Sequence, residues 1–94
     1  MLPERDATAL EDMLAYSREA VELTQGRTRE DLGRDRLLVL GLQRLVEIVG
    51  EAANRVSKAT QAEFPEIPWQ PIIGMRNRLI HGYDVIDVDV VWGP

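Results

Sequence analysis

Apolar side chains recur along most of the chain at spacings of three and four residues, which is typical of amphipathic α-helices. The first such stretch runs from residue 5 to about residue 25 and is ended by Gly26. Its seam, with Met13 and Ala20 alongside, consists of Leu10, Leu14, Ser17, Val21 and Thr24. The polar residues 28–33 then predict a connection between two helices.

The longest element is predicted from residue 34 to about residue 61. Its apolar seam steps by four and three residues through Leu38, Leu42, Leu45, Val49, Ala52 and Val56. A second stripe and a wider apolar surface are formed by Val39, Val46, Ala53, Leu37, Leu40 and Ile48. A helix that is apolar on several sides is expected to be buried on two sides, and a homodimer is the most economical way to bury it.

Two glycines, Gly41 and Gly50, interrupt this long apolar helix. Each lowers the helix propensity by about 1 kcal/mol relative to alanine. We expect them to be tolerated because they let another backbone approach closely.

Prolines mark the end of the long helix and the start of the next. Residues 64–69 predict a loop, whereas Pro71 can occupy the first turn of a helix from about residue 69 to residue 81. Gly82 is expected to stop that helix. Residues 84–92 alternate in polarity, but a lone strand would have no partner, so we favour a short helix capped by Asp87. The chain therefore predicts an all-α bundle of four to five helices.

Composition limits the function classes. The 94 residues are expected to form a single domain over residues 1–94, and the absence of cysteine excludes disulfides and thiolate catalysis. A net charge of -5 counts against a general nucleic-acid binder, although it leaves room for a local basic site. The chain has no apolar run of membrane-spanning length and its first residues lack the form of a signal peptide, so we expect a soluble cytoplasmic protein.

The strongest candidate site surrounds His81, the one histidine of the chain. Arg76 lies five positions before it and Tyr83 two positions after it, with Arg78 in between. An imidazole transfers protons near neutral pH, and a guanidinium holds phosphate oxygens and stabilises developing negative charge. Together these groups could cleave RNA without a metal ion.

The spacing of Arg76 and His81 constrains their geometry. On a straight helix, residues five apart lie about 140° apart around the axis, so the two side chains do not share one face. Either the helix loosens at Ile80-His81, before Gly82, or the working pair forms between two chains at a two-fold axis. The second arrangement agrees with the homodimer expected from the long helix.

Structural readings of the same residues remain open. A histidine near a helix C-terminus is stabilised by the helix dipole, and Tyr83 could be a half-buried packing residue. Asn77 could be a satisfied polar neighbour, and Glu51 could lie on a solvated helix face or line the cleft. The carboxylates of Asp84, Asp87 and Asp89 lack a metal-binding spacing, so helix capping and solvation explain them better than a metal. No cofactor is expected.

The order of these features resembles the HepT-like branch of the HEPN superfamily. The resemblance extends from about residue 5 to Trp92 and is most specific at Arg76-Asn77 and His81-Gly82-Tyr83. The Ile48-Val49-Gly50-Glu51-Ala52-Ala53 run, the proline–tryptophan loop and the downstream Asp87 and Trp92 add to it.

The resemblance implies an antiparallel helical bundle that forms a two-fold homodimer and acts as a metal-independent endoribonuclease. Arg76 and His81 would be catalytic, with Asn77, Arg78 and Glu51 as supporting residues of the site. The protein would be the toxin of a type VII-like toxin–antitoxin module. Its partner would be an MntA-like minimal nucleotidyltransferase, which as antitoxin transfers AMP from ATP to Tyr83.

Two other readings compete with the nuclease. One is a non-catalytic HEPN dimer that serves as a binding module for the nucleotidyltransferase or for a nucleotide. The other is a dimeric helical bundle without a site. His81 separates them, because a binding module tolerates its replacement and a nuclease does not.

Overall fold

The computed structural model describes the backbone of residues 2–80 and the side chains of residues 2–76. Five helices lie in this part of the chain: α1 (Glu4–Thr24), α2 (Arg29–Arg34), α3 (Arg36–Arg55), α4 (Lys58–Glu63) and α5 (Trp69–Ile80). The all-α prediction is thus confirmed for the described residues. The helix expected over residues 84–92 and the stop expected at Gly82 lie outside them.

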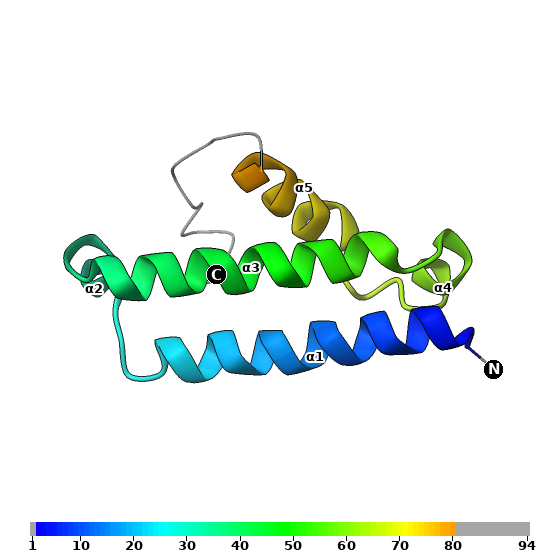
Figure 1. Cartoon of the computed structure of the whole chain (residues 1–94), viewed down its shortest axis with the longest axis horizontal. Helices are drawn as coiled ribbons and strands as arrows, with labels where there is room; N and C mark the ends of the chain where they lie inside the picture. Colours follow the sequence, from blue (N-terminus) through cyan, green and yellow to red (C-terminus); the bar gives the residue numbers. More distant parts are fainter. Residues whose placement is uncertain (1, 81–94) are drawn as a thin grey trace.

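Helix α3 is the centre of the fold (Figure 1). It runs antiparallel to α1 along its length, and α5 packs on it from the other side. Where α1, the second half of α3 and the start of α5 meet, the first core cluster consists of Ala9, Met13, Ala52, Ala53, Val56, Trp69 and Ile73. Nearer the start of α3, the second cluster consists of Leu32, Leu38, Leu42 and Met75. The seam expected for the long helix is therefore largely the side that faces the core.

The first helix buries only part of the seam predicted for it, because Leu10 packs on the first core cluster whereas two other members are exposed. Leu14 and Val21 of that seam are 54% and 66% exposed, whereas Ala9 and Met13 are buried. The first core cluster contains Ala9 and Met13 of α1 together with Ala52 and Ala53 of α3. Leu14, Val21 and Leu23 leave part of the apolar surface of α1 exposed outside the two clusters.

The connection predicted over residues 28–33 contains the short helix α2. Thr28 and Asp31 form a reciprocal capping box at its start, with the Thr28 N–H donating to Asp31 Oδ2 at 2.8 Å. Leu32 of α2 is buried in the second core cluster. A polar segment thus becomes helical because one apolar anchor and one capping box stabilise it.

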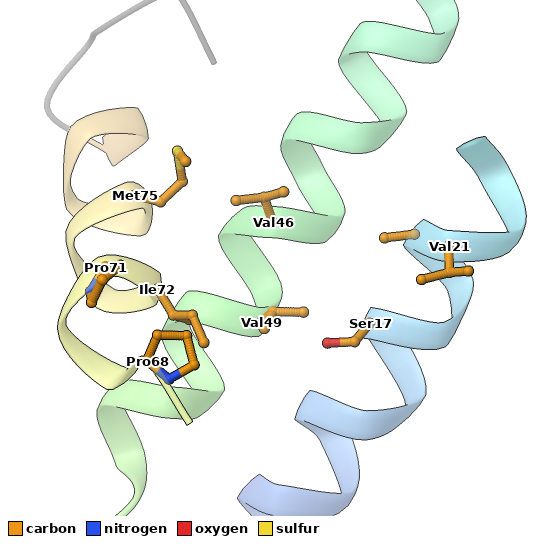
Figure 2. A pocket seen from close by; sticks show the side chains of 9 residues that line it. Ser17, Val21, Val46, Val49, Pro68, Pro71, Ile72 and Met75 are labelled. Atoms are coloured by element: carbon orange, nitrogen blue, oxygen red, sulfur yellow. The ribbon is translucent and has the colours of Figure 1, made fainter. Parts of the chain in front are cut away.

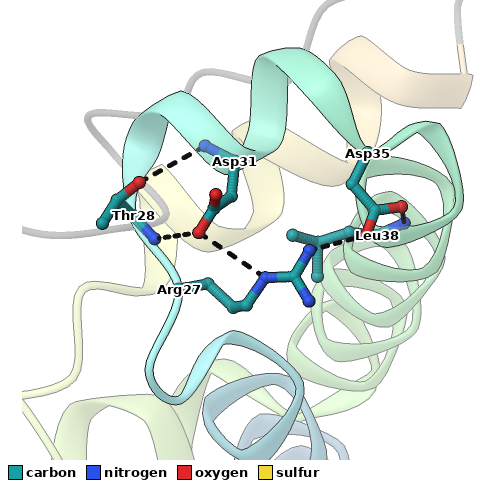
Figure 3. A network of polar contacts seen from close by, with 5 residues as sticks. All are labelled: Arg27, Thr28, Asp31, Asp35 and Leu38. Atoms are coloured by element: carbon teal, nitrogen blue, oxygen red, sulfur yellow. Dashed lines mark hydrogen bonds and ion pairs between the residues drawn. The ribbon is translucent and has the colours of Figure 1, made fainter.

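Arg27 ties this corner to the start of α3 (Figure 3). Its Nη2 donates to Asp35 Oδ2 at 2.6 Å, and its Nε lies 3.6 Å from Asp31 Oδ2. Asp35 also caps α3, because its Oδ1 accepts from the Leu38 N–H at 3.1 Å. The same network therefore fixes the end of α2 and the beginning of α3.

The long helix predicted over residues 34–61 is broken into α3 and α4. Val56 is extended and Ser57 caps α4, with the Thr60 N–H donating to Ser57 Oγ at 3.3 Å. The buried Gln61 side chain donates to the carbonyl oxygen of Val56 at 3.0 Å and of Ala53 at 3.5 Å. A helix ends with unsatisfied carbonyls, so Gln61 compensates the end of α3.

A buried carboxylate on α1 fixes this break. Asp6 is 2% exposed and accepts hydrogen bonds from the Ser57 N–H at 3.0 Å, the Ser57 hydroxyl at 2.6 Å and the Thr60 hydroxyl at 2.5 Å. These donors, with the Ser57 hydroxyl foremost, hold the pKa of Asp6 below its ordinary value against the opposing effect of burial. The start of α4 is therefore tied to the start of α1.

This carboxylate should make stability depend on acidity. Because its pKa is lower in the folded than in the unfolded chain, its contribution is present at neutral pH and is lost as pH falls below about 4. Urea unfolding at a series of pH values would measure this effect. At pH 7 the free energy of unfolding of the wild-type protein should exceed that of the Asp6→Asn variant, and the difference between the two should shrink toward pH 3. Asp35, whose pKa is also lowered, is common to both proteins. Parallel pH curves for the two proteins would contradict the assignment.

Candidate functional site

The helix that carries the candidate site is anchored at its start. Trp69 is buried and its Nε1 donates to the carbonyl oxygen of Phe64 at 3.0 Å, which joins the proline loop to α5. Pro71 lies in the first turn, where its missing N–H leaves no helical hydrogen bond unmade. Ile73 and Met75 then bury one side of α5 in the core. These contacts hold α5 in place, and Arg76 directly follows the buried Met75 on it.

Arg76 lies where α5 crosses α3. The residue is partly buried, and its Nε atom is buried. The stem of its side chain packs against Gly50, which is itself buried. A Cβ atom built on Gly50 would collide with Arg76 Cβ and would come within 3.0 Å of Arg76 Cγ and 3.1 Å of the Ile72 carbonyl oxygen. The sequence predicted a close approach at Gly50, and the structure confirms it.

The other glycine of α3 is different. A Cβ on Gly41 would meet only Leu23 Cδ2 within 4 Å, at 3.4 Å, which is an ordinary contact. The close approach expected at this position is therefore a side-chain contact, and α3 does not need a glycine there.

The structure describes only some of the remaining candidate residues. Glu51 is partly buried on α3, directly after Gly50. Asn77 and Arg78 continue the backbone of α5, which stays helical through Ile80. His81 and Tyr83 lie outside the described residues. The backbone is helical through Ile80, and the loosening considered at Ile80-His81 extends beyond the described residues.

An apolar groove adjoins this site (Figure 2). It encloses about 290 Å³ between α1, α3 and α5, and its lining consists of Ser17, Ala20, Val21, Val46, Val49, Pro68, Pro71, Ile72 and Met75. Because none of these side chains is charged, the groove does not suit a phosphate. It fits an apolar surface or segment.

Neither a metal-binding cluster nor a membrane-spanning helix is found in the described part of the chain. No three acidic or histidine side chains there are grouped closely enough to hold a metal ion. None of the described helices has the length and apolar character needed to cross a membrane.

Comparison with known proteins identifies the family. The model of the family described as "Ribonuclease HepT-like" matches residues 13–93, a stretch that includes Gly50, Arg76, His81 and Tyr83. This chain belongs to the ribonuclease HepT-like family. The resemblance drawn from the sequence motifs is thereby confirmed.

Individual relatives are similar over most of their length. "Probable ribonuclease HepT" of Thermococcus cleftensis is 38% identical over 85 residues, covering 86% of this chain and 77% of the relative. "Putative RNase MJ0125" of Methanocaldococcus jannaschii is 32% identical over 92 residues, covering 97% of this chain and 79% of the relative. No solved structure matches this HepT-like chain.

Proposed function

We propose that this protein is a metal-independent endoribonuclease that acts in the cytoplasm, with Arg76 and His81 as its catalytic residues. The observation that carries the proposal is the match to the ribonuclease HepT-like family over residues 13–93, which includes both residues. Relatives whose names denote ribonucleases support RNA as the substrate. The packing of the Arg76 stem against Gly50 also supports the proposal, because it restrains the side chain that carries the guanidinium.

The proposed reaction uses the RNA 2′-hydroxyl as nucleophile. His81 accepts the 2′-hydroxyl proton, the 2′-oxygen bonds to phosphorus, and the bond from phosphorus to the 5′-oxygen breaks. The second His81 of a dimer, or a water, protonates the leaving 5′-oxygen. Arg76 holds the phosphate oxygens while negative charge develops on them. The products are a 2′,3′-cyclic phosphate and a free 5′-hydroxyl, and DNA is not cut because it lacks the nucleophile.

Three further residues complete the proposed site. Asn77 and Arg78 follow Arg76 on α5, where an amide and a second guanidinium could hold the RNA backbone. Glu51 follows Gly50 on the facing helix and is partly buried. A carboxylate there could orient a cationic group of the site.

The proposed active form is a two-fold homodimer. Large apolar side chains remain exposed on α1 and α3: Leu14, Val21, Leu23, Leu37 and Leu40. Leu37 is 82% exposed, although α3, on which it lies, buries Leu38 and Leu42 in the core. A partner chain that covers some of these side chains would remove them from water, and a two-fold axis would let each chain supply Arg76 and His81 to one cleft.

The proposed biological role is that of a toxin in a type VII-like toxin–antitoxin module. Its antitoxin would be an MntA-like minimal nucleotidyltransferase that transfers AMP from ATP to the hydroxyl of Tyr83. The added phosphate places a bulky anion two residues from His81, where it could pair with Arg76 or Arg78. Tyr83 is then a switch that blocks the cleft and is not itself a catalyst.

Cleavage of RNA by purified protein tests the catalytic proposal. Wild type and His81→Ala are compared with EDTA present throughout, after mass spectrometry has shown Tyr83 to be unmodified. We expect wild type alone to cleave and to leave 2′,3′-cyclic phosphate ends. Equal cleavage by both proteins would contradict the role of His81. No cleavage by either would favour the non-catalytic binding module.

A further inference from the structure

Gly50 and Arg76 form the closest approach found at any described glycine. The two residues are far apart in sequence, on α3 and α5, and are brought together where the helices cross. A single added carbon on Gly50 would collide with the Arg76 side chain at its first atom. It would also press on the Ile72 carbonyl oxygen, which lies four residues before Arg76 and is the helical acceptor for the Arg76 N–H.

We propose that Gly50 is a positioning residue for the catalytic guanidinium of Arg76, an inference that rests on the proposed ribonuclease function. The bare backbone of Gly50 forms the surface against which the Arg76 stem packs. This surface fixes both the depth of α5 on α3 and the direction in which the guanidinium leaves the helix. Gly50 touches no substrate in this proposal and acts through Arg76 alone.

The effect should fall on the chemical step. A guanidinium that stabilises charge in the transition state must lie in the right place, and a displacement of about 1 Å can reduce a rate about 100-fold. Substitution by alanine at residue 50 would move the Arg76 stem outward, because backbone and Cβ atoms cannot rotate away as a side-chain end can. RNA would still bind through its other contacts, so KM should change much less than kcat.

The chain supplies matched controls for this substitution. Gly41 lies on the same helix as Gly50, and a Cβ there would make an ordinary contact with Leu23. Gly74 lies two residues before Arg76 on α5, and a Cβ there would meet nothing within 4 Å. Since alanine favours helix more than glycine does, Gly41→Ala and Gly74→Ala should remain as stable as wild type or become more stable.

The test compares Gly50→Ala, Gly41→Ala and Gly74→Ala by circular dichroism, thermal melting and RNA cleavage kinetics. We expect folded Gly50→Ala to lose about 100-fold in kcat with KM changed less than about threefold, while both controls keep wild-type kinetics within about twofold. A wild-type kcat in folded Gly50→Ala would overturn this inference and leave the proposed ribonuclease function standing. A wild type that does not cleave RNA would overturn the proposed function, and the catalytic role of this contact with it.

A second measurement needs no folded Gly50→Ala. Nitrogen-15 relaxation of arginine Nε–H groups in the wild-type protein reports how rigidly each stem is held. We expect the Arg76 Nε–H to be ordered and that of Arg34, whose side chain is 79% exposed, to be mobile. Equal mobility at the two arginines would overturn the positioning role, whatever the activity of the variants.

A pair of double variants checks that the contact itself is responsible. Arg76→Gly removes the Cβ with which an alanine at residue 50 would collide, whereas Arg76→Ala keeps it. Melting temperatures should therefore show that Gly50→Ala costs less in the Arg76→Gly background than in the Arg76→Ala background. An equal cost in both backgrounds would place the effect of Gly50→Ala elsewhere and would overturn the inference.

Discussion

Replacing Arg76 with alanine is expected to lower kcat for RNA cleavage by about 10²- to 10³-fold, which is the usual effect of removing a group that stabilises transition-state charge. Arg76→Lys should recover only part of this loss, because an ammonium keeps the charge but cannot offer two parallel donors to a phosphate. Single-turnover cleavage of a defined RNA by each purified variant would measure the effect. Both variants should keep the helical circular dichroism spectrum, because the stem of residue 76 is not a member of the two apolar clusters.

Arg34→Ala is the matched control for charge. Its side chain is 79% exposed on α2. Its Nη2 lies 4.0 Å from Oε2 of Glu30, whose side chain is 82% exposed. An effect of net charge on RNA binding would appear in both arginine variants, whereas a catalytic effect would appear only at residue 76. If Arg76→Ala retained wild-type kcat in a folded protein, the guanidinium would not be part of the catalytic machinery.

Replacing Leu42 with alanine is expected to have the largest effect on stability. Leu42 is 1% exposed and is the largest fully buried side chain among the described residues. Truncating such a leucine usually destabilises a domain by about 2–5 kcal/mol, through lost transfer energy and the cavity left behind. This is a large share of the 5–15 kcal/mol by which domains are typically stable, so the melting temperature should fall steeply.

Urea unfolding followed by circular dichroism would measure the loss at Leu42. Leu42→Met is the matched control, because it nearly conserves volume and should cost less than about 1.5 kcal/mol. If alanine cost as little as methionine, less than about 1.5 kcal/mol, the second core cluster would tolerate a cavity at this position. Leu42 would then contribute little to the contact between α2, α3 and α5.

Local signals in the sequence determined most of the helices. The period of apolar residues placed α1 and the beginning of α3, and the prolines placed the loop before α5. These features depend on residues close together in the chain, so the sequence expresses them directly. The sequence also singled out Arg76, His81 and Tyr83 as the candidate site, and the family match covers all three.

The break after α3 could not be predicted in the same way. The helical spacing of apolar residues continues through Val56, and no proline or glycine stands between Val56 and Phe64 to end the helix. The break is stabilised by Asp6, a residue about fifty positions earlier, whose carboxylate accepts the backbone N–H and the hydroxyl of Ser57. A polar contact between distant segments overrides the local helical preference because burying the carboxylate without those donors would be costly.

The place of Arg76 was likewise decided by tertiary structure. The sequence alone indicated that Gly50 admits a close approach and that Arg76 is a candidate phosphate-binding group, but it gave no reason to join them. The crossing of α3 and α5 joins them, because a residue without a Cβ is the surface against which the Arg76 stem packs. The sequence by itself determined α1, the beginning of α3 and α5, and the chemistry of their side chains. Tertiary packing alone decided which side chains meet, since that depends on how closely two backbones can approach.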